Sequence, residues 1–214
     1  MKKEMKAVAA LMLMTAVVFV ATGFKKNDEK NSGATGGKPS SFVDLGLPSG
    51  TLWAKWNVGA SCPEEAGDQF IWGETNKPKS GIDVEYSRPG QVLEERDDAA
   101  TANWGKNWRT PTIEEWKELK RCCAIRSTEQ GCYVVGPNGN SIFLPYTNQY
   151  WSATFARRWG DSSTGYFIQV VRNYIDFDEN SSIGYPGKKF WVRPVLKYTK
   201  DEYMMMSIEK QLGN

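Results

Sequence analysis

The sequence predicts an α+β domain made of short antiparallel strands with one or two helices. Nine Trp, nine Tyr and nine Phe among 214 residues provide large apolar side chains for a compact core. Twenty Gly and ten Pro predict many turns and few helices. The clearest helical periodicity is confined to the segment after Pro111. We therefore expect one domain at residues 42–196, a length that suits a single hydrophobic core.

The first residues have the pattern of an export signal. Three lysines precede an apolar run from Ala7 to Val20, which is too short for a confident membrane span. Small residues at Ala21–Gly23 suit cleavage, so we expect a signal peptide at residues 1–23 that engages the membrane only during export. Phe24 stands where a lipoprotein signal would carry its lipid-modified cysteine. The expected location is secreted, periplasmic or at the cell surface, with a retained N-terminal anchor as the alternative.

Composition predicts a flexible linker and argues against one class of partner. Residues 25–41 are rich in Lys, Asn, Gly and Ser and contain no aromatic residue, so we expect a linker at residues 24–41. The whole chain has a net charge of +2, and the leader alone, with three Lys and one Glu, accounts for it. A nearly neutral mature protein argues against a nucleic-acid partner.

In the first part of the domain, short apolar segments alternate with turn residues. Pro48–Gly50 is expected to form a turn, and the polar segment Thr75–Arg96 is expected to form a surface loop. The expected strands are residues 42–47, residues 51–54 continuing at 56–58, and residues 70–74.

The strongest helix signal begins at Thr112, a suitable N-cap whose partner Glu115, three residues later, completes a capping box. This helix is expected to end near Cys122–Cys123. Its buried face should carry Ile113, Trp116 and Leu119. A separate helical turn is expected at residues 97–102.

The second part of the domain lacks helical periodicity and alternates strand and turn signals. The Asn-Gly pair within Gly136–Asn140 predicts a hairpin turn. The expected strands are residues 133–135, 142–145, 150–155, 165–171, 174–177 and 190–196. The tail at residues 197–214 is expected to contain a short C-terminal helix.

The cysteines leave their pairing open. Export permits disulfides, and the four residues Cys62, Cys122, Cys123 and Cys132 allow three pairings that the sequence cannot choose between. The absence of histidine excludes a Cys/His zinc site and a His-based catalytic triad. A reactive thiol would lack a histidine base, so we expect structural or disulfide-bonded cysteines.

Ordered motifs throughout the domain are similar to those of one known family. The match extends from about Phe42 to Leu196. The matching segments are Val43–Ala54, Asn57–Ala60, Trp72–Thr75, Asp98–Ala100, Trp108–Thr112, Gly136–Pro145, Tyr150–Ser152 and Val192–Val195. In these segments the chain resembles the Fibrobacter succinogenes major paralogous domain.

The resemblance implies a C-type-lectin-like fold, which that family shares with formylglycine-generating enzymes and with target proteins of diversity-generating retroelements. The variable segment of those target proteins corresponds here to Tyr150–Val195. The resemblance therefore implies an exported, non-enzymatic ligand-binding or adhesion protein. Two alternatives stay open: a formylglycine-generating-like enzyme, whose paired cysteines have no counterpart at Cys122–Cys123, and a structural module of a surface or fimbrial assembly.

A ligand-binding surface is expected within residues 150–180. Trp, Tyr and Arg dominate many binding surfaces, and loops on a rigid scaffold often carry recognition. The aromatic and basic residues before Gly160 are expected to form a loop between strands. The expected ligand-binding residues are Thr154, Phe155, Arg157, Arg158, Trp159, Asn173, Tyr174, Asp176, Asp178 and Asn180. The partner would be a surface protein or a glycan; an ordinary surface loop is the alternative.

Other aromatic and polar residues are expected to be structural. Arg109 and Arg193 are expected to be buried or half-buried and bonded to loop carbonyl groups rather than to an anion. The segment Asp176–Asn180 carries oxygen ligands of the kind that Ca²⁺ prefers, but alternation with apolar residues favours a solvated strand face. No metal or cofactor is expected. The Trp residues expected in the core are Trp108, Trp116, Trp151 and Trp191.

Overall fold

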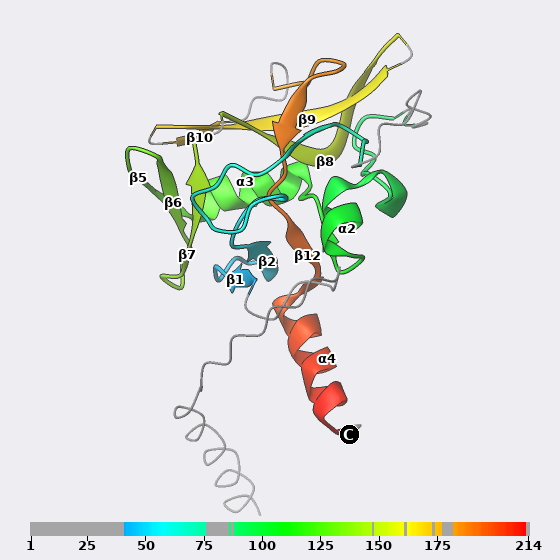
Figure 1. Cartoon of the computed structure of the whole chain (residues 1–214). Coiled ribbons are helices and arrows are strands. Elements are labelled where there is room, and N and C mark those ends of the chain that lie inside the picture. The colour runs from blue at the N-terminus through cyan, green and yellow to red at the C-terminus, as the bar shows by residue number, and fades with distance from the viewer. Residues whose placement is uncertain are drawn as a thin grey trace, which may run out of the picture. The chain divides into compact units, whose positions relative to one another are not determined.

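The computed structural model describes residues 41–75, 86, 88–146, 148–160, 162–172, 174–176 and 182–212 (Figure 1). The chain separates into two units, Met1–Gly33 and Ala34–Asn214, and every described residue belongs to the second. The expected signal peptide and all of the expected linker except Ser41 lie outside the described residues. Within the described part, no helix is long and apolar enough to cross a membrane.

The described part is a mixed α+β structure with three mostly antiparallel sheets, as the sequence predicts. The four-stranded sheet has the order β1 (Phe42–Asp44), β2 (Thr51–Ala54), β12 (Val195–Thr199), β4 (Trp108–Arg109). The five-stranded sheet has the order β10 (Tyr174–Asp176), β9 (Ser162–Val171), β8 (Asn148–Trp159), β11 (Lys189–Trp191), β3 (Gln69–Ile71). The three-stranded sheet has the order β5 (Ala124–Ser127), β6 (Gly131–Val135), β7 (Ser141–Pro145).

The helices are α2 (Ala99–Trp104), α3 (Ile113–Cys122) and α4 (Lys200–Leu212), preceded by a short 3₁₀ turn at Glu95–Asp97. Asp98 caps α2 by accepting hydrogen bonds from the backbone N–H groups of Ala100 and Thr101. The predicted helical turn at residues 97–102 is therefore present, shifted by about two residues, and α4 confirms the helix expected in the tail.

The helix α3 confirms the sequence prediction in detail. Thr112 is its N-cap, and Thr112 and Glu115 form the complete capping box. The expected face is buried: Trp116 contacts Trp53 of β2 at 4.8 Å and Tyr150 of β8 at 5.7 Å between ring centroids. The helix therefore fills the core between strands of two different sheets, because its apolar stripe has two walls to pack against.

Arg193 is a fully buried structural residue, as expected. Its Nε donates to Asn57 Oδ1 at 2.8 Å, and its two terminal nitrogens donate to the carbonyl oxygens of Ala54 (3.1 Å) and Phe143 (2.8 Å). Burial lowers the pKa of this guanidinium to about 10. Arg193 thus joins three segments that are distant in sequence.

Arg109 is held by a carboxylate rather than by loop carbonyls alone. Its guanidinium donates two hydrogen bonds to Glu115, at 2.5 and 2.7 Å, and a long one to the Thr110 carbonyl. Among the expected core tryptophans, Trp108, Trp116 and Trp151 are buried and Trp191 is partly buried.

Four predicted strands differ from the structure, and one of them, 70–74, is a strand only at Gln69–Ile71 because Trp72 and Gly73 form a turn. The first predicted strand ends at Asp44 because Gly46 turns the chain with a φ of +70°. Residues 56–58 form bends and a turn instead of a strand, because Asn57 is held by Arg193. The predicted strand 190–196 is divided into β11 and β12, which belong to different sheets. The strand β5 was not predicted.

Candidate functional site

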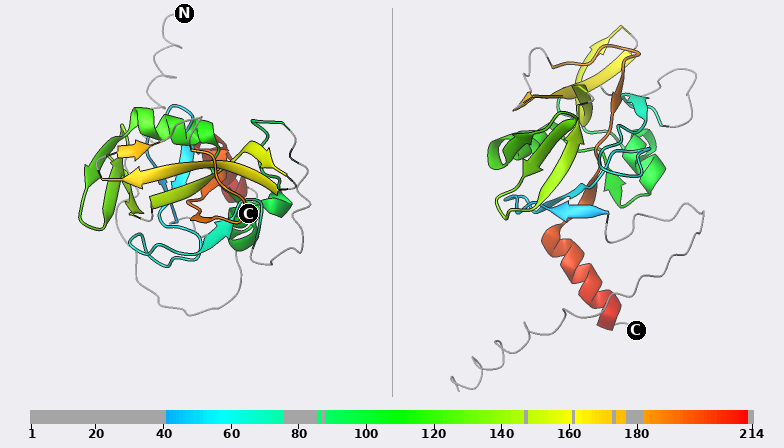
Figure 2. Two further views of the ribbon diagram at one scale, coloured as in Figure 1. Left: turned by 90° about the horizontal axis from the view of Figure 1, so that it is seen from above. Right: turned by 60° about the vertical axis from the view of Figure 1, so that its left-hand side comes forward.

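The long β8–β9 ribbon forms the candidate site. Its register extends from the pair Asn148–Val170 at one end to Trp159–Ser162 at the other. Figures 1 and 2 show the two strands side by side along their length, with β10 at one end and the connecting turn at the other. The prediction of a loop before Gly160 is therefore wrong: β8 continues to Trp159, and Gly160, with a φ of +55°, begins the turn.

Two of the expected ligand-binding residues are buried. Thr154 is 6 % exposed, and its hydroxyl accepts a hydrogen bond from the Ile113 N–H at 3.0 Å. Phe155 is 1 % exposed and packs against Trp72 and Tyr86. Both were expected to contact a ligand, Phe155 from a loop and Thr154 from the strand before it, but the segment around Val92 pairs with β8 here and covers this part of the strand. Thr154 and Phe155 are thus scaffold residues.

An exposed cluster, which we call the tip cluster, consists of Arg157, Trp159 and Tyr185. Trp159 and Tyr185 are 41 % and 61 % exposed, and their ring centroids lie 6.0 Å apart. The Arg157 guanidinium carbon lies 5.0 Å from the centre of the Trp159 ring, within the range of a cation–π contact. Two exposed aromatic rings and a stacked cation therefore share one surface.

Tyr185 lies in the tip cluster because residues 182–184 pair with β9 on the edge opposite β8. The Gly184 N–H donates to the Gly165 carbonyl at 3.0 Å, and the Phe167 N–H donates to the Ser182 carbonyl at 3.0 Å. The sequence analysis missed Tyr185, because it limited the site to residues 150–180. The turn signal in Gly184–Gly187, with its central Pro, would have marked this tyrosine as exposed.

The remaining expected residues do not join the tip cluster. Tyr174, 54 % exposed, pairs with Val171 at the opposite end of β9. Val171 and Ser162 lie roughly 30 Å apart along the strand, at about 3.3 Å per residue. Asp176 is half-buried beside Tyr174, and one of its oxygens lies 3.7 Å from the Lys120 ammonium. The expectation of a single patch that includes Trp159 and Tyr174 is therefore wrong.

Four expected site residues cannot be placed in full. Asn173, Asp178 and Asn180 lie outside the described residues, and for Arg158 the structure describes the backbone alone, within β8. Their assignment as ligand-binding residues stays a prediction.

Two small glycines let the ribbon pack tightly on the domain. A Cβ atom at Gly165 would lie 2.0 Å from Trp72 Nε1, and one at Gly184 would lie 2.4 Å from the Trp151 ring. The Trp72 indole also donates to the Ser152 carbonyl of β8 at 2.9 Å. These contacts fix the base of the ribbon and hence the position of the tip cluster.

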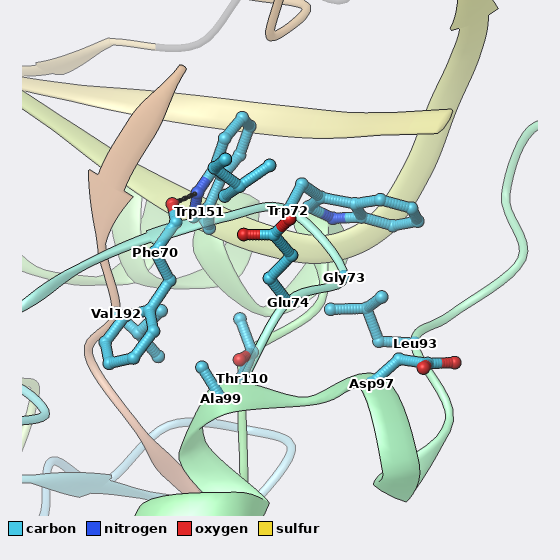
Figure 3. A pocket seen from close by; sticks show the side chains of 11 residues that line it. Phe70, Trp72, Gly73, Glu74, Leu93, Asp97, Ala99, Thr110, Trp151 and Val192 are labelled. Carbon is cyan, nitrogen blue, oxygen red and sulfur yellow. Dashed lines mark hydrogen bonds between the residues drawn. The ribbon is translucent and has the colours of Figure 1, made fainter. Parts of the chain in front are cut away.

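The described residues also surround two hollows away from the tip. One, of about 10 Å³, has room for about one water molecule. It lies between Phe70, Trp151 and Val192, and on its wall the Trp151 indole donates to the Phe70 carbonyl at 2.6 Å (Figure 3). The other is open and polar, with a volume of about 290 Å³, and is lined by Asp68, Gln69, Phe70, Ile71, Glu74, Thr75 and Lys189.

The cysteines are free thiols, so none of the three possible pairings is present. Burial raises the pKa values of Cys123 and Cys132 to about 11, which keeps both thiols protonated and poorly nucleophilic at neutral pH. Within the part of the chain that the structure describes, no group of three or more Cys, Asp or Glu residues could hold a metal ion.

Comparison with protein-family models, with curated proteins and with solved structures found no match to this chain. The resemblance drawn from the sequence motifs accordingly stays a prediction.

Proposed function

We propose that this chain is an exported, non-enzymatic recognition protein that binds a surface protein or a glycan through the tip cluster, on a C-type-lectin-like scaffold. The observation that carries the proposal is the exposed arrangement of Arg157, Trp159 and Tyr185. Trp, Tyr and Arg are the three residue types most enriched among residues that dominate binding energy.

The ribbon supports this role because it presents the cluster on a rigid base. Next to the cluster, Phe155 is buried and its backbone exchanges hydrogen bonds with Gly90 and Gln91. The tip cluster therefore extends from an element that the core holds on two sides. A rigid scaffold loses little conformational entropy on binding, which leaves more of the contact energy as affinity.

The C-type-lectin-like assignment and the export assignment rest on the sequence. The ordered motifs from Phe42 to Leu196 support the first, and the basic start followed by an apolar run supports the second. One structural feature agrees with a display module: β1 and β12, the first and last strands of the domain, both pair with β2. Both ends of the domain are thus in one sheet, and the tip cluster is in another.

The test is a binding screen of the full-length chain against immobilised surface glycans and surface proteins, followed by dissociation constants for each hit. Trp159→Ala and Arg157→Gln should each weaken binding at least tenfold. The matched controls Tyr174→Ala and Arg172→Gln, at the other end of the ribbon, should change it less than twofold. Unchanged binding of every hit by both tip variants would exclude the tip cluster as the recognition surface.

A structural role in a surface assembly is a second candidate, and the helix α4 favours it. Met204, Met205, Ile208 and Leu212 of this helix are 53 %, 58 %, 45 % and 82 % exposed. Among the described side chains of α4, only Tyr203 and Ser207 on the opposite side are partly covered, with Tyr203 packed on Phe42. Sedimentation of the full-length chain and of an Ile208→Gln variant tests it: this role requires assemblies that the variant loses.

A further inference from the structure

We infer that the ligand of the tip cluster is an acidic, extended segment of a partner polypeptide, which adds as a strand to the outer edge of β8. This inference rests on the proposed function, and it names the chemistry of the partner. Three features of the described residues carry it: the charge of the tip, the open backbone edge of β8 and the kinds of polar group near the cluster.

The tip has an excess of positive charge. The two segments that build it, residues 155–160 and 182–188, contain Arg157, Arg158 and Lys188 and no acidic residue. Asp161 in the connecting turn is the one acid between Phe155 and Phe167 in the sequence. Because the chain as a whole has a net charge of only +2, this concentration is local. Such a patch attracts a negatively charged partner and raises its rate of association.

Arg157 is available for an acidic group. Among the residues that the structure describes, its recorded contact is the stacking on Trp159, and no carboxylate pairs with it. Stacking on an indole leaves the planar edge of a guanidinium open, and that edge matches a carboxylate with two parallel hydrogen bonds. The contact also limits the motion of the side chain, so that less entropy is lost when a partner binds.

At its end, the outer edge of β8 has no backbone partner among the described residues. Upstream, Ala153 and Phe155 form backbone hydrogen bonds with Gly90, Gln91 and Leu93 on that edge. Beyond Phe155, residues 156–159 form no backbone hydrogen bond on this edge to any described residue. An added strand would therefore extend β8 pairing beyond Gly90 and would use backbone groups that have no partner among the described residues.

The side chains favour an acidic strand at this edge. Arg157 and Trp159 are two residues apart on one strand, so they share one face of the ribbon, and Tyr185 lies beside Trp159 on that face. A strand added next to β8 places its own side chains directly opposite these two residues. An Asp or Glu opposite Arg157 and an apolar residue near Trp159 would complement the surface.

The polar groups near the tip cluster favour a polypeptide over a sugar. Sugar hydroxyl groups both donate and accept hydrogen bonds, and carboxylate and amide side chains supply the matching acceptors, which Arg and Lys lack. Residues 155–160, 162–167 and 182–189 contain no Asp, Glu, Asn or Gln. The tip offers guanidinium and ammonium donors, aromatic rings and a free strand edge, and an acidic peptide uses all three.

The experiment selects random dodecapeptides displayed on phage against the full-length chain, with the Arg157→Gln, Trp159→Ala double variant as the counter-selection. We expect enrichment of peptides with alternating Asp or Glu, depleted in Pro. Fluorescence anisotropy then measures each synthetic peptide. Binding should fall at least tenfold for Arg157→Gln, and less than twofold for the matched control Arg172→Gln at the other end of the ribbon.

A second measurement tests strand addition itself. A copy of the best peptide with Pro at alternate positions keeps its charge but lacks the N–H groups that a strand needs, so it should bind at least tenfold more weakly. Amide hydrogen exchange of residues 156–159 should slow when the parent peptide binds. Equal binding of the Pro peptide, or unchanged exchange, would overturn strand addition.

The outcomes separate this inference from the proposed function. No enrichment over the double variant, or enrichment without acidic residues, overturns the acidic-peptide inference. If in that case an immobilised glycan or a folded protein surface still binds and loses affinity in Trp159→Ala, the proposed function stands without this inference. If no probe distinguishes the tip variants from the wild-type chain, both fail.

Discussion

The two halves of β8 differ in environment although they form one continuous strand. From Tyr150 to Phe155 every residue is buried, and neighbours cover both edges of the strand. From Arg157 to Trp159 the described side chains are exposed, and the outer edge has no described partner. The covered half contributes packing to the core, whereas the projecting half displays a cation and an aromatic ring at low cost to the fold.

This difference arises from tertiary coverage rather than from residue type. Both halves contain a tryptophan: Trp151 is 2 % exposed, and Trp159 is 41 % exposed. Trp151 contacts Phe190 at 4.3 Å and donates a hydrogen bond to the Phe70 carbonyl, whereas among the described residues Trp159 contacts the two other members of the tip cluster. If the comparison is correct, substitutions along the ribbon should destabilise the fold less and less toward the tip.

Trp151→Ala should have the largest effect. It removes an aromatic side chain from the covered half and leaves a cavity beside Phe190 and the Phe70 carbonyl. Substitutions of this kind cost about 3–5 kcal/mol of unfolding free energy. Urea unfolding followed by circular dichroism measures the loss. A cost below about 1 kcal/mol would mean that this half of the strand is not part of the core.

Gly165→Ala should have the second largest effect. The new methyl group would lie 2.0 Å from Trp72 Nε1, so the ribbon or the indole must move. Overpacking of this kind typically costs about 1–3 kcal/mol. Gly160→Ala in the turn is the matched control. The new methyl group there would meet no other atom within 4 Å, so its loss of about 1–2 kcal/mol of unfolding free energy would come from the positive φ alone. Only Gly165→Ala should alter the near-ultraviolet circular dichroism, because only it displaces a tryptophan.

Thr154→Val should have a smaller effect on the covered half. It keeps the shape of the side chain but removes the hydroxyl that accepts the hydrogen bond of the Ile113 N–H at the start of α3. A buried donor left without a partner costs about 1–3 kcal/mol. Thermal unfolding of Thr154→Val and of Thr154→Ser, which retains the hydroxyl, distinguishes the hydrogen bond from packing. Equal loss in both variants would show that the hydrogen bond contributes nothing measurable.

The features that the sequence analysis predicted correctly depend on short-range signals. The capping box of Thr112 and Glu115, the buried face of α3 and the hairpin turn with its Asn-Gly pair all involve residues a few positions apart. The burial of Arg193 also agrees with its expected structural role. Local patterns were therefore sufficient for these elements.

The features that it missed depend on pairing between distant segments. Phe155 lies among aromatic and basic residues that are typical of a binding surface, but the segment around Val92 covers it. The residues near Phe155 in the sequence do not indicate that this distant segment packs there. Tyr185 joins Trp159 only because residues 182–184 pair with β9. The same register places Tyr174 at the opposite end of the ribbon. The composition of the sequence indicated which types of side chain form the candidate site. The strand register determines which of these side chains lie close together.

Trp159→Ala should have the smallest effect on the fold. The ring is 41 % exposed, and its contacts among the described residues are Tyr185 and Arg157, so its loss should change the free energy of unfolding by no more than about 0.5 kcal/mol. Arg157→Gln should be similarly neutral, since the pair it forms with the indole at an exposed site contributes about 0.5–1 kcal/mol at most. Urea unfolding of both variants beside Trp151→Ala gives the decisive contrast within one strand. If Trp159→Ala were as costly as Trp151→Ala, Trp159 would be a core residue and the projecting half would not be a display surface. If instead the tip variants fold normally while they lose ligand, the same strand serves as core at one end and as recognition surface at the other.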